Sequence, residues 1–337
     1  MYTSVVGRKF LNAYNKAYGK SYSPEEFFRE VFIPLFFDHP KYLMTAGNAP
    51  LENPKISWGD MILGKKPYED ALKRQDRIEK TMKRILEEKP DASIARGYPA
   101  TEGSSPTLSQ VTNMEIQSSS DDSMLSWVGD ALSIGVSGGI TILFDDESVL
   151  LDLFKGWGYY REYVNTHPMM KGNQINTWNG VWLAYYYGPH YNERMPVNSE
   201  KISKDASGIM SLSTTSWISV LSGMVNREKR DTMTGYLYSI GQTNSTFGFI
   251  PFSLNEIRRP FQLYKKLFGE QALVRDHAKM ELLFGGGVGL HAVCRRGAIG
   301  VRSMEPKGLH EYMVTSSKRK NIKKPESEDD TITYNIY

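Results

Sequence analysis

Apolar residues recur with the period of an α-helix through the first part of the chain. Phe10 and Tyr14 lie one turn apart, and residues 23–26, Ser-Pro-Glu-Glu, form a capping-box sequence that starts a second helix. An apolar stripe also runs along residues 67–89, between charged residues that would face solvent in a helix. These patterns predict a helical N-terminal region over residues 1–90.

The apolar pattern changes to that of β-strands in the middle of the chain. Residues 134–144 are uncharged and largely apolar, which predicts a buried strand bent at its glycines, and residues 148–165 return to a helical pattern. Along residues 233–240, Tyr236, Tyr238 and Ile240 alternate with Leu237 and Ser239, as in a half-buried strand. A short polar turn separates this segment from residues 245–252, which predicts a hairpin.

The overall order of these patterns predicts an α+β or mixed α/β fold, with a helical N-terminal part, a β-containing middle and a helical C-terminal part. Residues 91–123 are rich in Ser, Gly and Pro, which predicts a polar linker or mobile loop. We therefore expect a mixed α/β domain over residues 124–313. Residues 314–337 carry runs of basic and then acidic side chains, which predicts a charged, mobile tail.

Composition narrows the class of protein. The 337 residues include 41 basic and 38 acidic side chains, a balance that does not by itself indicate nucleic-acid binding. The one cysteine, Cys294, cannot form a disulfide within the chain and fits a reducing compartment. The first residues lack the apolar core of a signal peptide, and the uncharged stretch 131–144 is shorter than the roughly 20 residues that span a bilayer. We therefore predict a cytoplasmic protein with no membrane partner.

Asp145, Asp146 and Glu147 form an acidic cluster between a predicted strand and a predicted helix. Carboxylates at such a place could hold Mg²⁺ for phosphodiester chemistry, which makes these residues the candidate catalytic group of a metal-dependent nuclease or phosphohydrolase. The same residues are also well suited to cap the helix and to interact with its dipole. We favour capping, and we therefore expect no cofactor, with Mg²⁺ belonging only to the alternative.

Aromatic, amide and basic side chains alternate in residues 157–191. In a nucleic-acid-binding protein, aromatic rings stack on bases, cations contact phosphates and amides read base edges. The candidates in this stretch are Arg161, Asn173, Gln174 and Trp178. An aromatic-rich core or a protein interface would have the same composition, and this interpretation stays open.

Local basic clusters supply the remaining candidates for a phosphate-binding face. One lies on the predicted helix 67–89 and two lie near the C-terminus: Lys73, Arg74, Arg77, Lys80, Lys83 and Arg84; Arg295, Arg296 and Arg302; and Lys318, Arg319 and Lys320. Gly287 and Gly289 precede a predicted helix, where free backbone amides can bind an anion, although a tight turn between helices explains the same glycines.

These signals lead to three hypotheses about function. The first is a nucleic-acid-handling protein, a non-catalytic subunit of a larger prokaryotic nucleoprotein complex, for which a defence complex is one setting. Its partners would be nucleic acid and other protein subunits. The second is the metal-dependent enzyme centred on the acidic cluster. The third is a protein-interaction scaffold that uses its aromatic residues.

Overall fold

The computed structural model describes residues 1–44, 50–51, 57–99, 116–239 and 245–269. Helix α1 (Tyr2–Tyr18) ends at Gly19. The φ of Gly19 is 61°, the left-handed conformation that glycine commonly adopts at the C-terminal end of a helix. After it, α2 (Pro24–Phe27), a π-helical turn (Phe28–Phe32) and α3 (Ile33–Phe36) follow one another without a break. The predicted capping box is confirmed, because Ser23 and Glu26 exchange side-chain-to-backbone hydrogen bonds.

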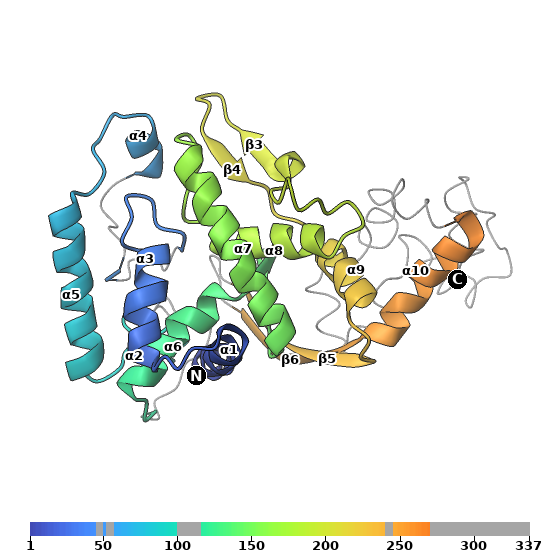
Figure 1. Cartoon of the computed structure of the whole chain (residues 1–337), viewed down its shortest axis with the longest axis horizontal. Helices are drawn as coiled ribbons and strands as arrows, with labels where there is room; N and C mark the ends of the chain where they lie inside the picture. The colour runs from blue at the N-terminus through green and yellow to red at the C-terminus, as the bar shows by residue number, and fades with distance from the viewer. Residues whose placement is uncertain (45–49, 52–56, 100–115, 240–244, 270–337) are drawn as a thin grey trace, which may run out of the picture.

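The helical N-terminal part is completed by three further helices. Helix α4 (Trp58–Ile62) is short, whereas α5 (Ala71–Glu87) is long, amphipathic and capped by Asp70. Helix α6 (Ser120–Ala131) begins at a second capping box, formed by Ser119 and Asp122. In Figure 1, α5 lies at the outer edge of this helical group, beside α2 and α3.

A four-stranded antiparallel sheet forms the middle, with strand order β1-β2-β5-β6. Strands β1 (Ile134–Val136) and β2 (Ile140–Phe144) pair with each other, and Gly138 and Gly139 between them have φ values of 93° and 72°. The prediction of buried β-structure over 134–144 is confirmed, but the prediction of one bent strand is wrong. The two left-handed glycines reverse the chain direction and produce a hairpin of two strands. Strands β5 (Thr232–Ser239) and β6 (Ser245–Ser253) form the second hairpin, as predicted.

Helices pack around this sheet. The long helix α7 (Glu147–Thr166) leads to α8 (Ile175–Tyr186), and a 3₁₀ turn (Ser199–Lys201) precedes the small hairpin of β3 (Ile202–Lys204) and β4 (Met210–Leu212). Helix α9 (Trp217–Arg227) and helix α10 (Leu254–Phe268) follow. Figure 1 shows α9 and α10 on one side of α7, with the N-terminal helices on the other.

One hydrophobic cluster connects these elements, from Val6 in α1 to Phe261 in α10. Four fully buried tryptophans, Trp127, Trp157, Trp178 and Trp182, lie in it. The described ends of the predicted linker also contact the core, since Ile94 is buried and its carbonyl accepts a hydrogen bond from the Trp127 indole. The α+β fold class is confirmed by the helical N-terminal part and the antiparallel sheets. The domain boundaries stay a prediction.

Candidate functional site

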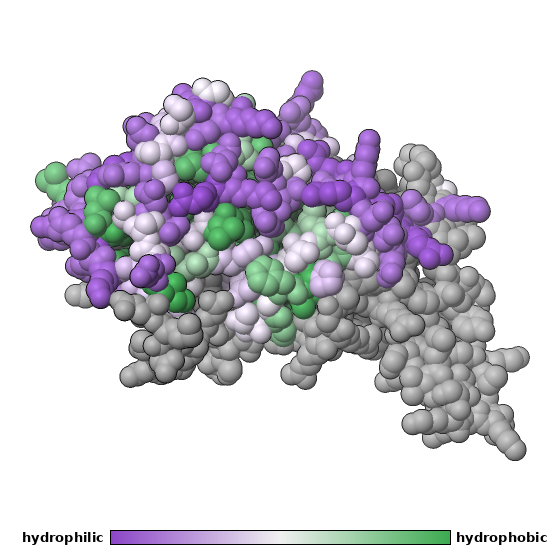
Figure 2. All heavy atoms as spheres, turned by 90° about the horizontal axis from the view of Figure 1, so that it is seen from below, coloured by the Kyte–Doolittle hydropathy of each residue, from purple (hydrophilic) through white to green (hydrophobic). Residues whose placement is uncertain are grey.

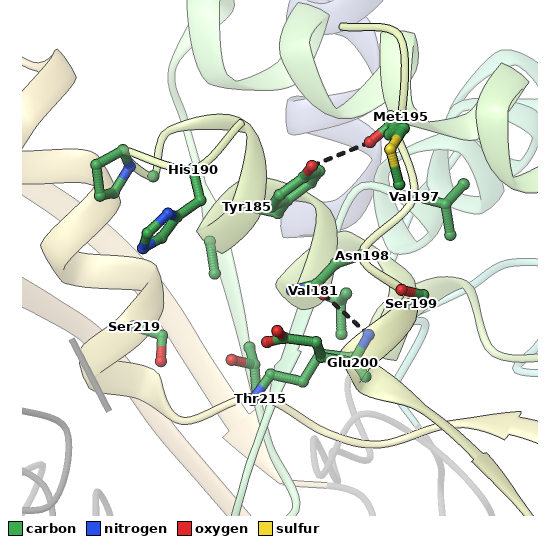
Figure 3. Close-up of a pocket in the computed structure, with 14 residues that line it drawn as sticks. Val181, Tyr185, His190, Met195, Val197, Asn198, Ser199, Glu200, Thr215 and Ser219 are labelled. Atoms are coloured by element: carbon green, nitrogen blue, oxygen red, sulfur yellow. Dashed lines mark hydrogen bonds between the residues drawn. The ribbon is translucent and has the colours of Figure 1, made fainter. Parts of the chain in front are cut away.

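A pocket of about 420 Å³ lies where α8, the loop that follows it and the start of α9 meet (Figure 3). We call it the α8–α9 pocket. Its wall consists of apolar residues, including Gly188 and Pro189 of the loop, and of polar residues. Its lining comprises Val181, Ala184, Tyr185, Gly188, Pro189, His190, Met195, Val197, Asn198, Ser199, Glu200, Lys201, Thr215 and Ser219.

Local hydrogen bonds hold the loop side of the pocket in place. The Tyr185 hydroxyl donates to the Met195 carbonyl over 3.0 Å, which fixes the middle of the loop to α8. Asn198 caps the 3₁₀ turn by accepting a hydrogen bond from the Glu200 amide at 3.1 Å. Figure 3 shows both interactions and the Glu200 side chain among the sticks that line the pocket.

Thr215 is one of two buried polar residues that line the pocket, the other being Ser219. The Thr215 carbonyl accepts hydrogen bonds from the Ser137 amide at 2.8 Å and from the Ser137 hydroxyl at 3.0 Å, so its backbone is tied to the β1–β2 hairpin. The residue is 1% exposed, yet its Oγ1 has no hydrogen-bond partner within the described chain. Because an unpaired buried hydroxyl costs free energy, the Thr215 hydroxyl calls for an explanation.

The first turn of α9 supplies the adjacent wall. Ser216 is the N-cap, and its hydroxyl accepts a hydrogen bond from the Ser219 amide at 3.1 Å. Ser219, which lines the pocket, lies in that first turn. The Ser219 hydroxyl also lies 2.9 Å from the Ser216 hydroxyl, so the amide and the hydroxyl of Ser219 both have partners within the turn. This wall therefore contributes chiefly the partial positive charge of a helix N-terminus.

The pocket rim carries charges of both signs. Glu200 and His190 are exposed and Lys201 is half-buried, so a carboxylate, an imidazole and an ammonium group all border one cavity. Such a set can bind a polar molecule that has an acceptor group at one end and donor groups at the other.

The acidic cluster predicted from the sequence has a structural use. Asp146 caps α7 by accepting from the Val149 amide at 3.0 Å, and it forms an ion pair with Arg230 at 2.6 Å. Burial alone would raise the pKa of Asp146, but hydrogen bonds from Arg230, Val149 and Ser148 lower it below its ordinary value. Asp145 pairs with Lys9 at 2.9 Å, and Glu147 is exposed. Within the described ranges, no three His, Cys, Asp or Glu side chains are grouped to hold a metal ion.

The basic candidates of α5 lie beside acids. Lys73 is exposed, and the other five are in ion pairs: Arg74 with Asp38, Arg77 with Glu69, Lys80 with Asp76, Lys83 with Glu87, and Arg84 with Glu88 and Asp91. This surface is therefore balanced in charge, and a phosphate bound there would compete with carboxylates.

The candidates of the aromatic stretch support the core. The Trp178 ring is stacked between Tyr160 and Trp182, and its indole donates to the Gly156 carbonyl at 2.9 Å. The Gln174 side chain accepts from the Leu212 amide at 3.0 Å, which ties it to β4. Asn173 is half-buried and has an interaction partner. These contacts match the alternative interpretation of this stretch as an aromatic-rich core.

Arg161 belongs to a buried basic cluster with His39 and Lys41. Its guanidinium donates to the carbonyls of Leu35 and Lys41, and burial lowers its pKa to about 10. The Lys41 ammonium donates to the carbonyls of Pro168 and Met170, and its pKa falls to about 8 through burial and through Arg161. Backbone carbonyls thus take the place of carboxylates as partners of these cations, and Arg161 holds the chain before α4 against α7.

His39 is expected to make stability depend on pH. Its Nδ1 lies 2.9 Å from the Lys41 amide, from which a neutral ring can accept, and 3.0 Å from the Lys41 carbonyl oxygen. Burial and the Arg161 charge lower its pKa from 6.5 to about 4. As pH falls from 6.5 to 4, the unfolded chain therefore binds a proton that the folded chain does not, and the free energy of unfolding decreases. Since the ring is partly exposed, we expect a loss of about 1–2 kcal/mol.

The control is His39→Asn, because Asn can accept the same hydrogen bond from the residue two positions on and does not titrate. Urea unfolding at pH 7, 5.5 and 4 should give a steeper loss for the original chain than for the variant. Equal pH dependence in both would show that His39 contributes nothing to it.

The exposed surface bears on the scaffold hypothesis. Figure 2 shows one face on which hydrophilic residues dominate and apolar side chains occur in small separate groups. Exposed large apolar residues within the described chain include Val5, Leu72 and Phe249. The scaffold hypothesis depended on exposed aromatic residues in the stretch 157–191, but these are largely buried. The hypothesis therefore gains no support from them, and the face in Figure 2 shows no large apolar patch.

The remaining sequence candidates lie outside the described residues: Gly287, Gly289, Arg295, Arg296, Arg302, Lys318, Arg319 and Lys320. The pocket residues Thr215, Glu200 and His190, in contrast, did not stand out in the sequence. The Gly-Pro turn and the polar loop after it were the available signals for a loop that borders a site.

A comparison of the chain with protein-family models, with curated proteins and with solved structures finds no match. In the part of the chain that the structure describes, no helix is long and apolar enough to cross a membrane.

Proposed function

We propose that this chain is a non-catalytic binding protein whose recognition site is the α8–α9 pocket. The observation that carries the proposal is Thr215, which lines the pocket and whose buried hydroxyl has no partner within the described chain. A ligand with a hydrogen-bond acceptor would satisfy it. A buried polar group that its own chain leaves unpaired calls for a partner from outside the chain, and a ligand in the pocket would supply one.

The contacts of the acidic cluster, Asp145 to Glu147, are consistent with a protein that binds without catalysing a reaction. Asp145 and Asp146 are each engaged by a cation, and Asp146 also caps a helix, so their placement is explained without a catalytic role. The nucleic-acid-handling role expected from the sequence stays a prediction. It would be a special case of the same proposal if the ligand of the pocket were part of a nucleic acid.

Thr215→Val is expected to stabilise the ligand-free protein by about 1–2 kcal/mol, because the nearly isosteric side chain removes a buried, unpaired hydroxyl. A residue retained for binding at the expense of stability behaves in this way. Urea unfolding of both proteins measures the difference. The matched control is Thr81→Val, since Thr81 is also 1% exposed but donates to the Arg77 carbonyl at 2.8 Å, and this variant should lose stability.

A thermal-shift screen against amino acids, sugars, dicarboxylates and nucleotides completes the test. At least one class should raise the Tm of the original chain and leave that of Thr215→Val nearly unchanged. If Thr215→Val and Thr81→Val lose stability alike and no class raises the Tm, the proposed function is wrong.

A further inference from the structure

The β3–β4 hairpin projects from the body of the molecule (Figure 1) and has two outer edges. The Lys201 carbonyl accepts a hydrogen bond from the Ser213 amide at 2.8 Å, so these two residues form a hydrogen-bonded pair of the ladder. Such pairs occur at every second residue of an antiparallel ladder. The backbone amides and carbonyls of Ile202 and Lys204 therefore point away from β4.

The outer edge of β4 is paired. The Met210 amide donates to the Met169 carbonyl, and the Met210 carbonyl accepts from the Lys171 amide, both at 2.9 Å. The Leu212 amide donates to the Gln174 side chain at 3.0 Å. On this side the small sheet is therefore closed by the residues between α7 and α8.

The outer edge of β3 is largely unpaired. The Ile202 amide belongs to the 3₁₀ turn, where it donates to the Ser199 carbonyl. Within the described chain, the Ile202 carbonyl and the amide and carbonyl of Lys204 have no hydrogen-bond partner. Lys204 is exposed and Ile202 is half-buried. A strand edge with unpaired donors and acceptors can pair with a strand from another molecule.

This edge begins beside the α8–α9 pocket. Glu200 and Lys201, which line the pocket, directly precede Ile202. A strand that runs antiparallel to β3 from Lys204 therefore reaches the pocket four positions later, next to Glu200. An apolar part of the pocket wall can take a large apolar side chain from that strand, and it includes Val181, Ala184 and Val197.

Charge selects the kind of strand that can pair with β3. Lys204 forms no ion pair within the described chain, and its neighbour across the ladder, Met210, is uncharged. An acidic residue opposite Lys204 would therefore stabilise an added strand. In a symmetric pair of β3 strands, the Lys204 side chains of the two copies would approach each other, which disfavours a second copy of this chain as the occupant.

We propose that β3 and the α8–α9 pocket together bind an extended segment of a partner protein. The segment pairs antiparallel with β3, places an acidic residue opposite Lys204 and inserts a large apolar side chain into the pocket four positions later. The inference rests on the proposed function for its use of the pocket, whereas the unpaired edge of β3 is an independent observation.

Fluorescence anisotropy of a labelled peptide, Thr-Glu-Val-Thr-Val-Leu-Thr, tests the inference with the full chain. Its Glu and Leu have the required spacing. N-methylation of the Glu residue removes the amide that pairs with the Lys204 carbonyl, and it should weaken binding at least tenfold. The matched control is N-methylation of the Val that follows Glu. The amide of this Val points away from β3, so the change should leave binding nearly unchanged.

Variants of the chain test the two parts of the surface. Lys204→Pro removes an outward amide without removing a bond to β4, and it should weaken binding about tenfold. Lys204→Glu should reverse the preference, so that a peptide with Lys in place of Glu binds better. Ala184→Phe fills the pocket and should weaken binding of the Leu peptide to that of a peptide with Ala in place of Leu. The control is Lys229→Glu, which changes an exposed residue outside β3 and the pocket. Circular dichroism establishes that each variant is folded.

Absence of peptide binding, or equal binding of the two N-methylated peptides, overturns the inference. A dimer in light scattering that Lys204→Pro abolishes also overturns it, because β3 then pairs with a second copy of this chain. If a small polar molecule binds in a Thr215-dependent manner and the peptide does not bind, the inference fails while the proposed function stands. If neither binds, both fail.

Discussion

Gly129→Ala is expected to lower the free energy of unfolding by about 3 kcal/mol or more, at the upper end of what overpacking costs. Helices α1 and α6 cross so closely that a Cβ on Gly129 would lie 1.9 Å from the Thr3 carbonyl oxygen. The contact is reciprocal, since a Cβ on Gly7 would lie 2.0 Å from the Leu125 carbonyl oxygen. Both obstacles are backbone atoms, so the added methyl group fits only if the two helices move apart.

The control for this prediction is Gly158→Ala in α7. Gly158 is exposed, and a Cβ there would meet no atom within 4 Å, so the variant should gain about 0.5–1 kcal/mol from improved helix propensity. Urea unfolding of the two variants beside the original chain measures both effects. If Gly129→Ala were as stable as Gly158→Ala, the α1–α6 crossing described above would have to be wrong.

The features that the sequence predicted well are those encoded by neighbouring residues. The capping box at Ser23 and Glu26, the amphipathic helix α5 and the β5–β6 hairpin each depend on contacts within a short segment. The hairpin over residues 134–144 was missed because its turn glycines were interpreted as a bend. Two successive glycines permit either shape, and only the antiparallel pairing of β1 with β2 in the folded protein shows which one forms.

The sites were harder to predict because burial depends on distant parts of the chain. Arg161 looked like a phosphate ligand, yet its partners are carbonyls of Leu35 and Lys41, about 120 residues away in sequence. The unpaired hydroxyl of Thr215 likewise depends on where α8, α9 and the β1–β2 hairpin meet. No local pattern of residues marks a threonine as unpaired, so the pocket could be recognised only in the folded protein.

The buried carboxylate of Asp130 links the segment before α6 to the sheet. It forms an ion pair with Arg96 at 2.8 Å and accepts a hydrogen bond from the Tyr238 hydroxyl at 3.1 Å, and the side chains of the ion pair are 11% and 4% exposed. Burial, followed by the charge of Asp130, raises the pKa of Tyr238 well above its ordinary value. Tyr238 therefore stays protonated and donates to the carboxylate.

Asp130→Ala is expected to lower the free energy of unfolding by about 3 kcal/mol, because it removes the carboxylate that pairs with the largely buried Arg96 and accepts from the buried Tyr238 hydroxyl. The contrasting control is Asp76→Ala, since Asp76 pairs with Lys80 at a similar distance, 2.7 Å, but both side chains are more than half exposed. A solvent-exposed pair contributes about 0–1 kcal/mol, so the control should change stability little.

The double variant Asp130→Leu with Arg96→Met distinguishes the contribution of the ion pair to stability from that of the other contacts of residues 91–98. If the cost of Asp130→Ala comes from the loss of the ion pair, removing both charges should restore much of the stability, because apolar side chains often replace a buried ion pair at little net cost. Urea unfolding of Asp130→Leu, Arg96→Met and the double variant gives the coupling free energy of the pair. Additive losses, with no recovery in the double variant, would mean that the ion pair is not what holds residues 91–98 against α6 and that the other contacts of this segment carry that role.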